Sequence, residues 1–306
     1  MKQRPMRLQK GDTVGIVAPA SPPNQQQLKK SLDFIEGLGL QYVMGESVTA
    51  KEHYLAGSDE LRVRDLQRMV EDPSIRAIFC ASGGYGSARI ADQLDYMLFE
   101  ENPKIFWGFS DITFLHTAIG ELSNLVTFHG PTLSSLGRED IPERTYLMFE
   151  QLFNPAEIYY DERISPLQTI AKGRVRAPIV GGNLTLLCES LGTKFEVDTA
   201  NKVLLIEDIG LEPAQIDAKL NQLRMARKFE HCAGVVIGSF THAEPRDYKD
   251  SPSLDALFTS YFKDFNKPVV SGFKFGHENL NVGIPLGVDV ILDADEKVLA
   301  FLPGVE

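Results

Sequence analysis

The residue best suited to nucleophilic chemistry is Ser110, in a Gly-Phe-Ser-Asp run. It follows the apolar run 105–107, which predicts a strand, and precedes a helical stretch that begins at Ile112. A serine in such a strand-to-helix turn is exposed at the carboxyl edge of a sheet, and the next N–H can stabilise an oxyanion. The match to G-x-S-x-G is incomplete, because Ile112 replaces the second glycine. Alternatively, Ser110 or Asp111 is simply a helix N-cap.

A second candidate is the loop Ser82-Gly83-Gly84-Tyr85-Gly86-Ser87, which lies between an apolar strand and a predicted helix. Glycines let the backbone approach a ligand and leave amides pointing at developing negative charge. Arg89 occupies the third glycine position of G-x-G-x-x-G, and the Gly-Lys-Ser/Thr of a P-loop is missing. The loop is therefore either a ligand loop or a tight turn.

Glu207 closes the apolar run 203–206 and is a candidate acid. A carboxylate at the end of a buried strand must find a hydrogen-bond partner or change its protonation state. Orienting a histidine would satisfy it. The alternative is a solvated acidic turn before the helix that begins at Pro213.

Six histidines are available, and spacing alone does not choose among them. His116 falls within a predicted helix, and His231 lies at a helix end, where a cation favours the dipole. His129, His242 and His277 each lie just beyond a predicted strand, and His277 has the most loop-like setting. No histidine pair at helical spacing with a nearby carboxylate suggests zinc, so we expect neither a metal nor another cofactor.

The N-terminal half alternates short apolar runs with amphipathic stretches of helix length. This rhythm predicts an α/β fold with a doubly wound, mostly parallel sheet. The expected strands are 13–17, 41–44, 77–80, 105–107 and 125–128, and the expected helices are 25–38, 61–71, 88–94 and 112–122.

Between residues 154 and 178 the periodicity fades and prolines punctuate a polar stretch, which is typical of a connection between domains. We expect a boundary near residue 165, giving domains 1–165 and 166–306. The pattern of the second domain predicts a mixed α/β unit. Its expected strands are 203–206, 234–240, 269–272, 288–292 and 298–302, and its expected helices are 184–191, 213–228 and 254–265.

The composition is that of an ordinary globular protein, with 43% hydrophobic and 24% charged residues. The net charge of −11 argues against nucleic acid or an anionic membrane as the main partner. The charged N-terminus is not followed by an apolar segment, which predicts a cytoplasmic protein. Cys80, Cys188 and Cys232 support neither a disulfide framework nor a metal knuckle, so we expect them to be buried apolar residues.

Eight short strings are spread along nearly the whole chain. They are Val14-Gly15-Ile16-Val17-Ala18-Pro19-Ala20-Ser21, Tyr54-Leu55-Ala56-Gly57-Ser58-Asp59-Glu60, Gly83-Gly84-Tyr85-Gly86-Ser87, Trp107-Gly108-Phe109-Ser110-Asp111-Ile112-Thr113, Thr127-Phe128-His129-Gly130-Pro131, Gly181-Gly182-Asn183-Leu184, Glu207-Asp208 and Gly276-His277. In this order they resemble the LD-carboxypeptidase family of serine peptidases, which also includes microcin-C-immunity-type enzymes.

The resemblance implies a Ser-Glu-His triad of Ser110, Glu207 and His277. It also implies an oxyanion hole formed by the backbone N–H groups of Gly84 and Asp111, an active site in a cleft between the domains, and a homodimer. An unassisted serine hydroxyl is a poor nucleophile and needs an imidazole oriented by a carboxylate, which agrees with these roles. Family members commonly have arginine before the glycine pair, where this chain has Ser82.

The implied function is a serine carboxypeptidase that hydrolyses the L,D-amide bond of murein tetrapeptide and releases terminal D-alanine in cell-wall recycling. The substrate would then be a small peptide, with neither nucleic acid nor membrane as partner. One alternative is a microcin-C-immunity-type amide hydrolase that acts on aminoacyl-nucleotide analogues. The other is a non-catalytic two-domain ligand-binding protein.

Overall fold

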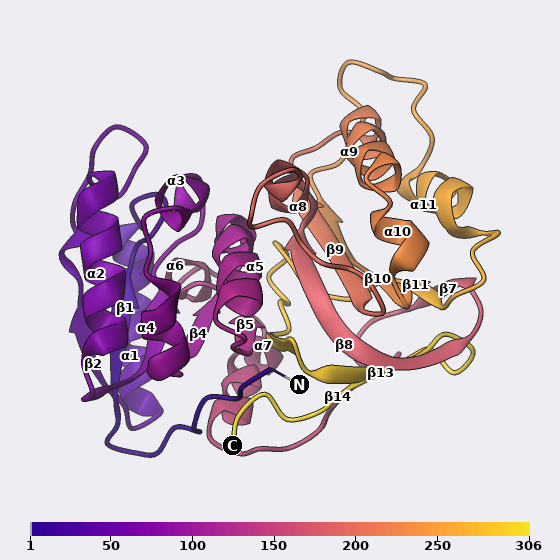
Figure 1. Cartoon of the computed structure of the whole chain (residues 1–306). Helices are drawn as coiled ribbons and strands as arrows, with labels where there is room; N and C mark the ends of the chain where they lie inside the picture. The colour runs from indigo at the N-terminus through magenta and orange to yellow at the C-terminus, as the bar shows by residue number, and fades with distance from the viewer. Residues whose placement is uncertain (1) are drawn as a thin grey trace. The chain divides into compact units, whose positions relative to one another are not determined.

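The computed structural model describes residues 2–306 (Figure 1). By contact the chain forms two compact units. The first unit holds the chain up to Ala156 together with Val282–Gly287 and Pro303–Glu306. The second unit holds Glu157–Asn281 and Val288–Leu302. The chain therefore passes between the units more than once, and two short C-terminal segments belong to the first.

The first unit is built on a six-stranded sheet in the order β12-β5-β4-β3-β1-β2. Neighbours from β2 to β5 are parallel, and β12 joins β5 antiparallel, so the expected doubly wound, mostly parallel sheet is confirmed. The strand order reverses at β1, and ligands of such sheets bind beyond the carboxyl ends of the strands at this point. The strands are β1 Thr13–Val17, β2 Gln41–Met44, β3 Ile75–Cys80, β4 Ile105–Gly108, β5 Thr127–His129 and β12 Ile284–Leu286.

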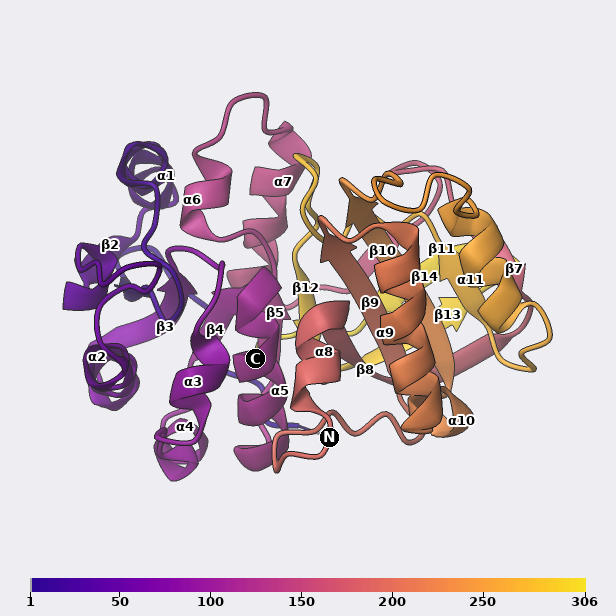
Figure 2. The same cartoon turned by 90° about the horizontal axis from the view of Figure 1, so that it is seen from above.

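Helices cover both faces of this sheet. Figure 2 shows α1, α6 and α7 on one face and α2, α3, α4 and α5 on the other. Two of the longer helices begin at side-chain caps, because Asn24 accepts from two amides of α1 and Ser58 accepts from the Leu61 amide of α2. The helices are α1 Gln25–Gly37, α2 Asp59–Glu71, α3 Ser87–Ala91, α4 Tyr96–Glu101, α5 Thr113–Leu122, α6 Leu133–Leu136 and α7 Glu143–Leu147, with 3-10 turns at Glu46–Val48, Ser110–Ile112 and Met148–Leu152.

The second unit contains an eight-stranded mixed sheet in the order β6-β14-β13-β8-β9-β10-β11-β7. Strands β8 to β11 are parallel, and the flanking strands pair antiparallel, which confirms a mixed α/β unit. Figure 1 shows β8 as a long, curved strand. The strands are β6 Ile158–Tyr160, β7 Gln168–Ala171, β8 Arg174–Asn183, β9 Val203–Ile209, β10 Gly234–Thr241, β11 Val269–Ser271, β13 Asp289–Asp293 and β14 Val298–Phe301.

The stretch 154–178 is not the plain connection that its polarity predicted. It contains β6, β7 and the first half of β8. β6 and β7 are short edge strands, and residues 174–176 of β8 are partly exposed, so none of them carries a continuous apolar run. Edge and half-exposed strands lack the pattern on which the prediction depended.

One apolar core joins the helices of the second unit to its parallel strands. Leu187, Leu220 and Phe262 from three helices pack with Ile206 and Val235 from the sheet. The expected helix 213–228 is divided in two, because Arg227 adopts a φ of +59°. The helices are α8 Leu184–Ser190, α9 Pro213–Met225, α10 Lys228–His231 and α11 Leu254–Phe262.

The expectation for the cysteines is confirmed: Cys80, Cys188 and Cys232 are free and buried. Within residues 2–306, none of the helices combines the length and apolar character needed to span a bilayer.

Candidate active site

Ser110 begins the 3-10 turn between β4 and α5 and has a φ of +65°. An L-residue in this left-handed region costs about 1–2 kcal/mol, and such backbone strain is concentrated at functional sites. The N-cap positions of the turn and of α5 belong to Phe109 and Ile112, so neither Ser110 nor Asp111 occupies the predicted capping position. The strained turn presents the serine at the carboxyl end of β4, as a nucleophile elbow does.

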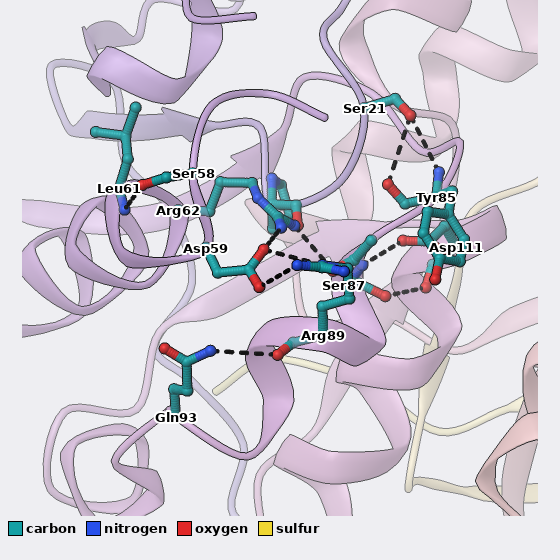
Figure 3. Close-up of polar contacts among 12 residues, drawn as sticks. Ser21, Ser58, Asp59, Leu61, Arg62, Tyr85, Ser87, Arg89, Gln93 and Asp111 are labelled. Atoms are coloured by element: carbon teal, nitrogen blue, oxygen red, sulfur yellow. Dashed lines mark hydrogen bonds and ion pairs between the residues drawn. The ribbon is translucent and has the colours of Figure 1, made fainter. Parts of the chain in front are cut away.

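Asp111 ties this turn to the glycine-rich loop (Figure 3). The Ser87 amide donates to Asp111 Oδ2 at 2.8 Å, and Ser87 Oγ donates to the Asp111 carbonyl at 2.6 Å. Asp111 is buried, and this burial raises the pKa of its carboxyl against the hydrogen bonds from Ser87 and Gly86, which lower it. The residue after Ser110 is thus fixed to the start of α3.

The glycine-rich loop lies directly against Ser110. A Cβ placed on Gly83 would be 3.0 Å from the Ser110 Cβ and 3.4 Å from its Oγ. Gly84 has a φ of +102° and faces the Ser21 side chain, so a larger residue there would be strained and crowded. The Ser21 amide donates to the Gly83 carbonyl at 3.1 Å, and the Tyr85 amide donates to Ser21 Oγ at 3.1 Å. The loop is therefore fixed on both sides of Gly84.

Ser82 has a defined place in this loop. Its hydroxyl donates to the Ser21 carbonyl, and the residue is buried. The side chain at this position thus joins the glycine-rich loop to the segment after β1.

Glu207 and His277 meet within the second unit. His277 Nδ1 is 2.9 Å from Glu207 Oε2, the Glu207 side chain is fully buried, and that of His277 is 7% exposed. The alternative of a solvated acidic turn is wrong, because β9 continues to Ile209 and Glu207 lies inside it. Gly276 permits the contact: its φ is +134°, and a Cβ there would lie 2.6 Å from Oε2.

Burial raises the pKa of the Glu207 carboxyl above its ordinary value. The charge and hydrogen bond of His277 act in the opposite direction, because both favour the carboxylate. A desolvated carboxylate that has an imidazole as its partner is suited to hold one tautomer and to stabilise the imidazolium.

Asp208 and Asn183 are supporting residues that sequence reasoning did not assign. Asp208 directly follows Glu207 in β9. Its carboxylate accepts from Asn183 Nδ2 at 3.1 Å and from the Thr185 amide at 2.9 Å and Thr185 Oγ1 at 2.7 Å. Asn183 caps α8 and pairs in register with Glu207. Its place in the Gly-Gly-Asn string before a helix was the signal available.

The other histidines lie elsewhere. His116 is buried in α5 with Nε2 2.8 Å from the Gly108 carbonyl, and burial lowers its pKa to about 4. His129 ends β5 and is buried, His231 ends α10, and His242 is exposed beyond β10. Across residues 2–306, no group of three or more His, Cys, Asp or Glu side chains is arranged to hold a metal ion.

Comparison with known proteins relates both units to one family. Residues 14–130 match the LD-carboxypeptidase N-terminal domain, and residues 176–292 match the LD-carboxypeptidase C-terminal domain. The chain is 44% identical over 306 residues to a probable murein peptide carboxypeptidase of Bacillus subtilis, a match that covers 100% of this chain and 96% of that protein. It is 29% identical over 290 residues to the murein tetrapeptide carboxypeptidase of Pseudomonas aeruginosa, covering 92% and 93%.

A solved structure extends this similarity to the three-dimensional fold. The MccF-like protein from Bacillus anthracis superposes with a TM-score of 0.86 at 27% identity and covers 98% of this chain and 99% of its own. Because both family domains match and the sequence identity spans the full length, the chain belongs to the LD-carboxypeptidase family of peptidases.

Proposed function

We propose that the protein is a serine carboxypeptidase that releases terminal D-alanine from murein tetrapeptide. The bond cleaved is the amide that joins the L-centre of the diamino acid to D-alanine. The observation that carries the proposal is the buried Glu207–His277 pair, with 2.9 Å between Oε2 and Nδ1. It is the acid–imidazole half of a triad, and the strained Ser110 turn supplies a suitable nucleophile.

The proposed mechanism uses groups of the chain alone. Glu207 accepts the Nδ1 proton of His277, which leaves Nε2 as the base that takes the Ser110 Oγ proton. Oγ attacks the scissile carbonyl, and the N–H groups of Gly84 and Asp111 stabilise the oxyanion. Collapse of this intermediate gives an acyl-enzyme, and His277 passes its proton to the departing amine of D-alanine. Water, activated by the same imidazole, then releases the tripeptide and restores Ser110.

Stereochemical selectivity would follow from this geometry. A site that holds the scissile carbonyl against the two amides presents the leaving residue's side chain to one wall. Inverted stereochemistry would misplace either the carbonyl or the terminal carboxylate, and even a misplacement of about 1 Å can cost about a hundredfold in rate. Ordinary L,L-peptides should therefore be poor substrates.

Two further proposals concern where the enzyme acts and how it assembles. We place the enzyme in the cytoplasm, in the recycling of imported wall fragments, and we propose a homodimer. The named murein peptide carboxypeptidases among its relatives support the substrate class.

A second candidate is an amide hydrolase that acts on aminoacyl-nucleotide analogues, because the MccF-like protein shares the fold at 27% identity. The deciding experiment is a direct competition that measures kcat/KM for diaminopimelyl-D-alanine tetrapeptide and for an aminoacyl sulfamoyl adenylate. We expect the tetrapeptide to be preferred. A kcat/KM about tenfold or more higher for the nucleotide analogue, a difference of about 1.4 kcal/mol in activation free energy, would instead support the second function. If neither compound is hydrolysed, the result would favour a ligand-binding protein.

A further inference from the structure

Arg62 is a fully buried arginine of α2 that the mechanism above does not use. Arginine is almost never fully buried unless it is paired. Its Nη1 donates to the Pro19 carbonyl at 2.7 Å and to the Gly86 carbonyl at 2.8 Å. Its Nη2 pairs with Asp59 in the same helix (Figure 3). One guanidinium therefore joins α2 to the segment after β1 and to the glycine-rich loop.

These two carbonyls belong to the segments that enclose Gly84. Pro19 leads into Ser21, which bonds to Gly83 and Tyr85, and Gly86 precedes Ser87, which bonds to Asp111. The chain after Gly84 is thus anchored to the Arg62 guanidinium directly, at the Gly86 carbonyl, and the chain before it is anchored indirectly, through the segment from Pro19 to Ser21. Glycines impose little conformational preference of their own, so a defined direction of the Gly84 amide requires such external anchors.

The Arg62 guanidinium is itself held in place. Asp59 also accepts two hydrogen bonds from Arg89, at 3.1 Å from Nε and 2.7 Å from Nη2. The planar guanidinium of arginine can donate to two carbonyls and a carboxylate at once in fixed directions. A lysine ammonium is a compact charge without this fixed fork of donors. Burying a charge is costly unless it is paired and hydrogen-bonded, and these contacts offset that cost.

We propose that Arg62 is a positioning residue that acts through the Pro19 and Gly86 carbonyls to aim the Gly84 amide at the oxyanion formed on Ser110. The inference rests on the proposed roles of Ser110 and Gly84. Loss of one oxyanion donor typically lowers turnover by about a hundredfold to a thousandfold, so a misdirected donor should cause a substantial part of that loss.

Arg62→Lys is the test variant, and Arg64→Lys is its matched control. Arg64 is in the same helix and also has a carboxylate partner, Glu46 at 2.9 Å, but its side chain is 62% exposed. Each variant is treated with a fluorophosphonate, and the rate of Ser110 modification is followed by mass spectrometry. This reaction needs the nucleophile and the oxyanion site but not the murein substrate.

We expect Arg62→Lys to be modified at least about tenfold more slowly than the wild type, and Arg64→Lys to stay within about twofold of it. On tetrapeptide, Arg62→Lys should lower kcat with little change in KM, because the Gly84 amide binds the oxyanion only in the transition state. An altered KM with an unchanged rate of Ser110 modification would instead indicate a role in substrate binding, and it would overturn the inference.

A second variant decides the case if Arg62→Lys does not fold. Asp59→Asn keeps an acceptor for Arg62 but removes the charge that fixes it, so a smaller fall in modification rate is expected. A wild-type rate in that variant would overturn the inference. Modification of wild-type Ser110 without tetrapeptide hydrolysis would refute the proposed substrate, while the variant rates would still test Arg62. If wild-type Ser110 is not modified at all, the proposed serine mechanism and the inference about Arg62 are both refuted.

Discussion

His277 Nδ1 and Glu207 Oε2 lie 2.9 Å apart, although 70 positions separate the two residues in the chain. Both belong to the second unit, so the pair is built by that unit alone. Glu207 comes from the central strand β9, and His277 comes from the segment after β11. A rigid strand therefore carries the acid, and a loop with a glycine at its turn brings the imidazole to it.

The first prediction concerns this pair. Glu207→Gln and His277→Ala should each lower kcat strongly, and the double variant should be little worse than the less active single variant, because triad members act as a unit. The measurement is kcat on tetrapeptide for the four proteins of the cycle. Losses that multiply would mean that the two residues act separately.

The second prediction concerns His116, whose buried ring has its pKa lowered to about 4 from an ordinary value of 6.5. Between these values the unfolded chain binds the proton more readily than the folded one. The contribution of the neutral His116 ring to the free energy of unfolding is therefore fully present above pH 6.5. It is lost as the pH falls toward 4, by roughly 3 kcal/mol at most. His116→Gln keeps a donor for the Gly108 carbonyl and removes the titration.

Denaturant unfolding of the wild type and His116→Gln at several pH values tests this. The variant should lose less stability on acidification and should retain its activity near neutral pH. An identical pH dependence in the two proteins would contradict the assignment of the buried, neutral histidine.

The third prediction tests the oxyanion role of Gly84. Gly84→Ala introduces a Cβ at a φ of +102°, against the Ser21 side chain. The shifted amide should lower kcat by about a hundredfold to a thousandfold. Gly11→Ala is the control, because Gly11 has a similar φ of +94° but nothing within 4 Å of the added Cβ. It shares the backbone penalty and should keep full activity. Equal activities of the two variants would exclude the role.

Much of the first unit could be predicted from the sequence, because β3 and β4 are buried parallel strands and therefore appear as continuous apolar runs. The strand-to-helix turn at Ser110 followed from its position between such a run and a helical pattern. In contrast, β12 is a three-residue antiparallel edge strand that contains Pro285, and it gives no comparable signal. Its pairing with β5 depends on contacts between residues far apart in the chain.

The site was predictable only in part. The strand before Glu207 made it a candidate acid but left a solvated turn as an alternative. His277 could be preferred to His129 and His242 only through the family strings, because a distance across 70 positions depends on topology. Arg62 gave no signal at all. In an amphipathic helix an arginine is expected at the surface, and its burial arises from carbonyl groups that two other loops supply.

The most direct test of the account is the activity of Ser110→Ala on murein tetrapeptide, with circular dichroism as the measure of folding. Ser74→Ala, at an exposed serine that bonds to Asp72, serves as the control. We expect kcat to fall on the order of a millionfold in Ser110→Ala, with an unchanged spectrum, and Ser74→Ala to match the wild type. A correctly folded Ser110→Ala protein that releases D-alanine at the wild-type rate would contradict the serine mechanism.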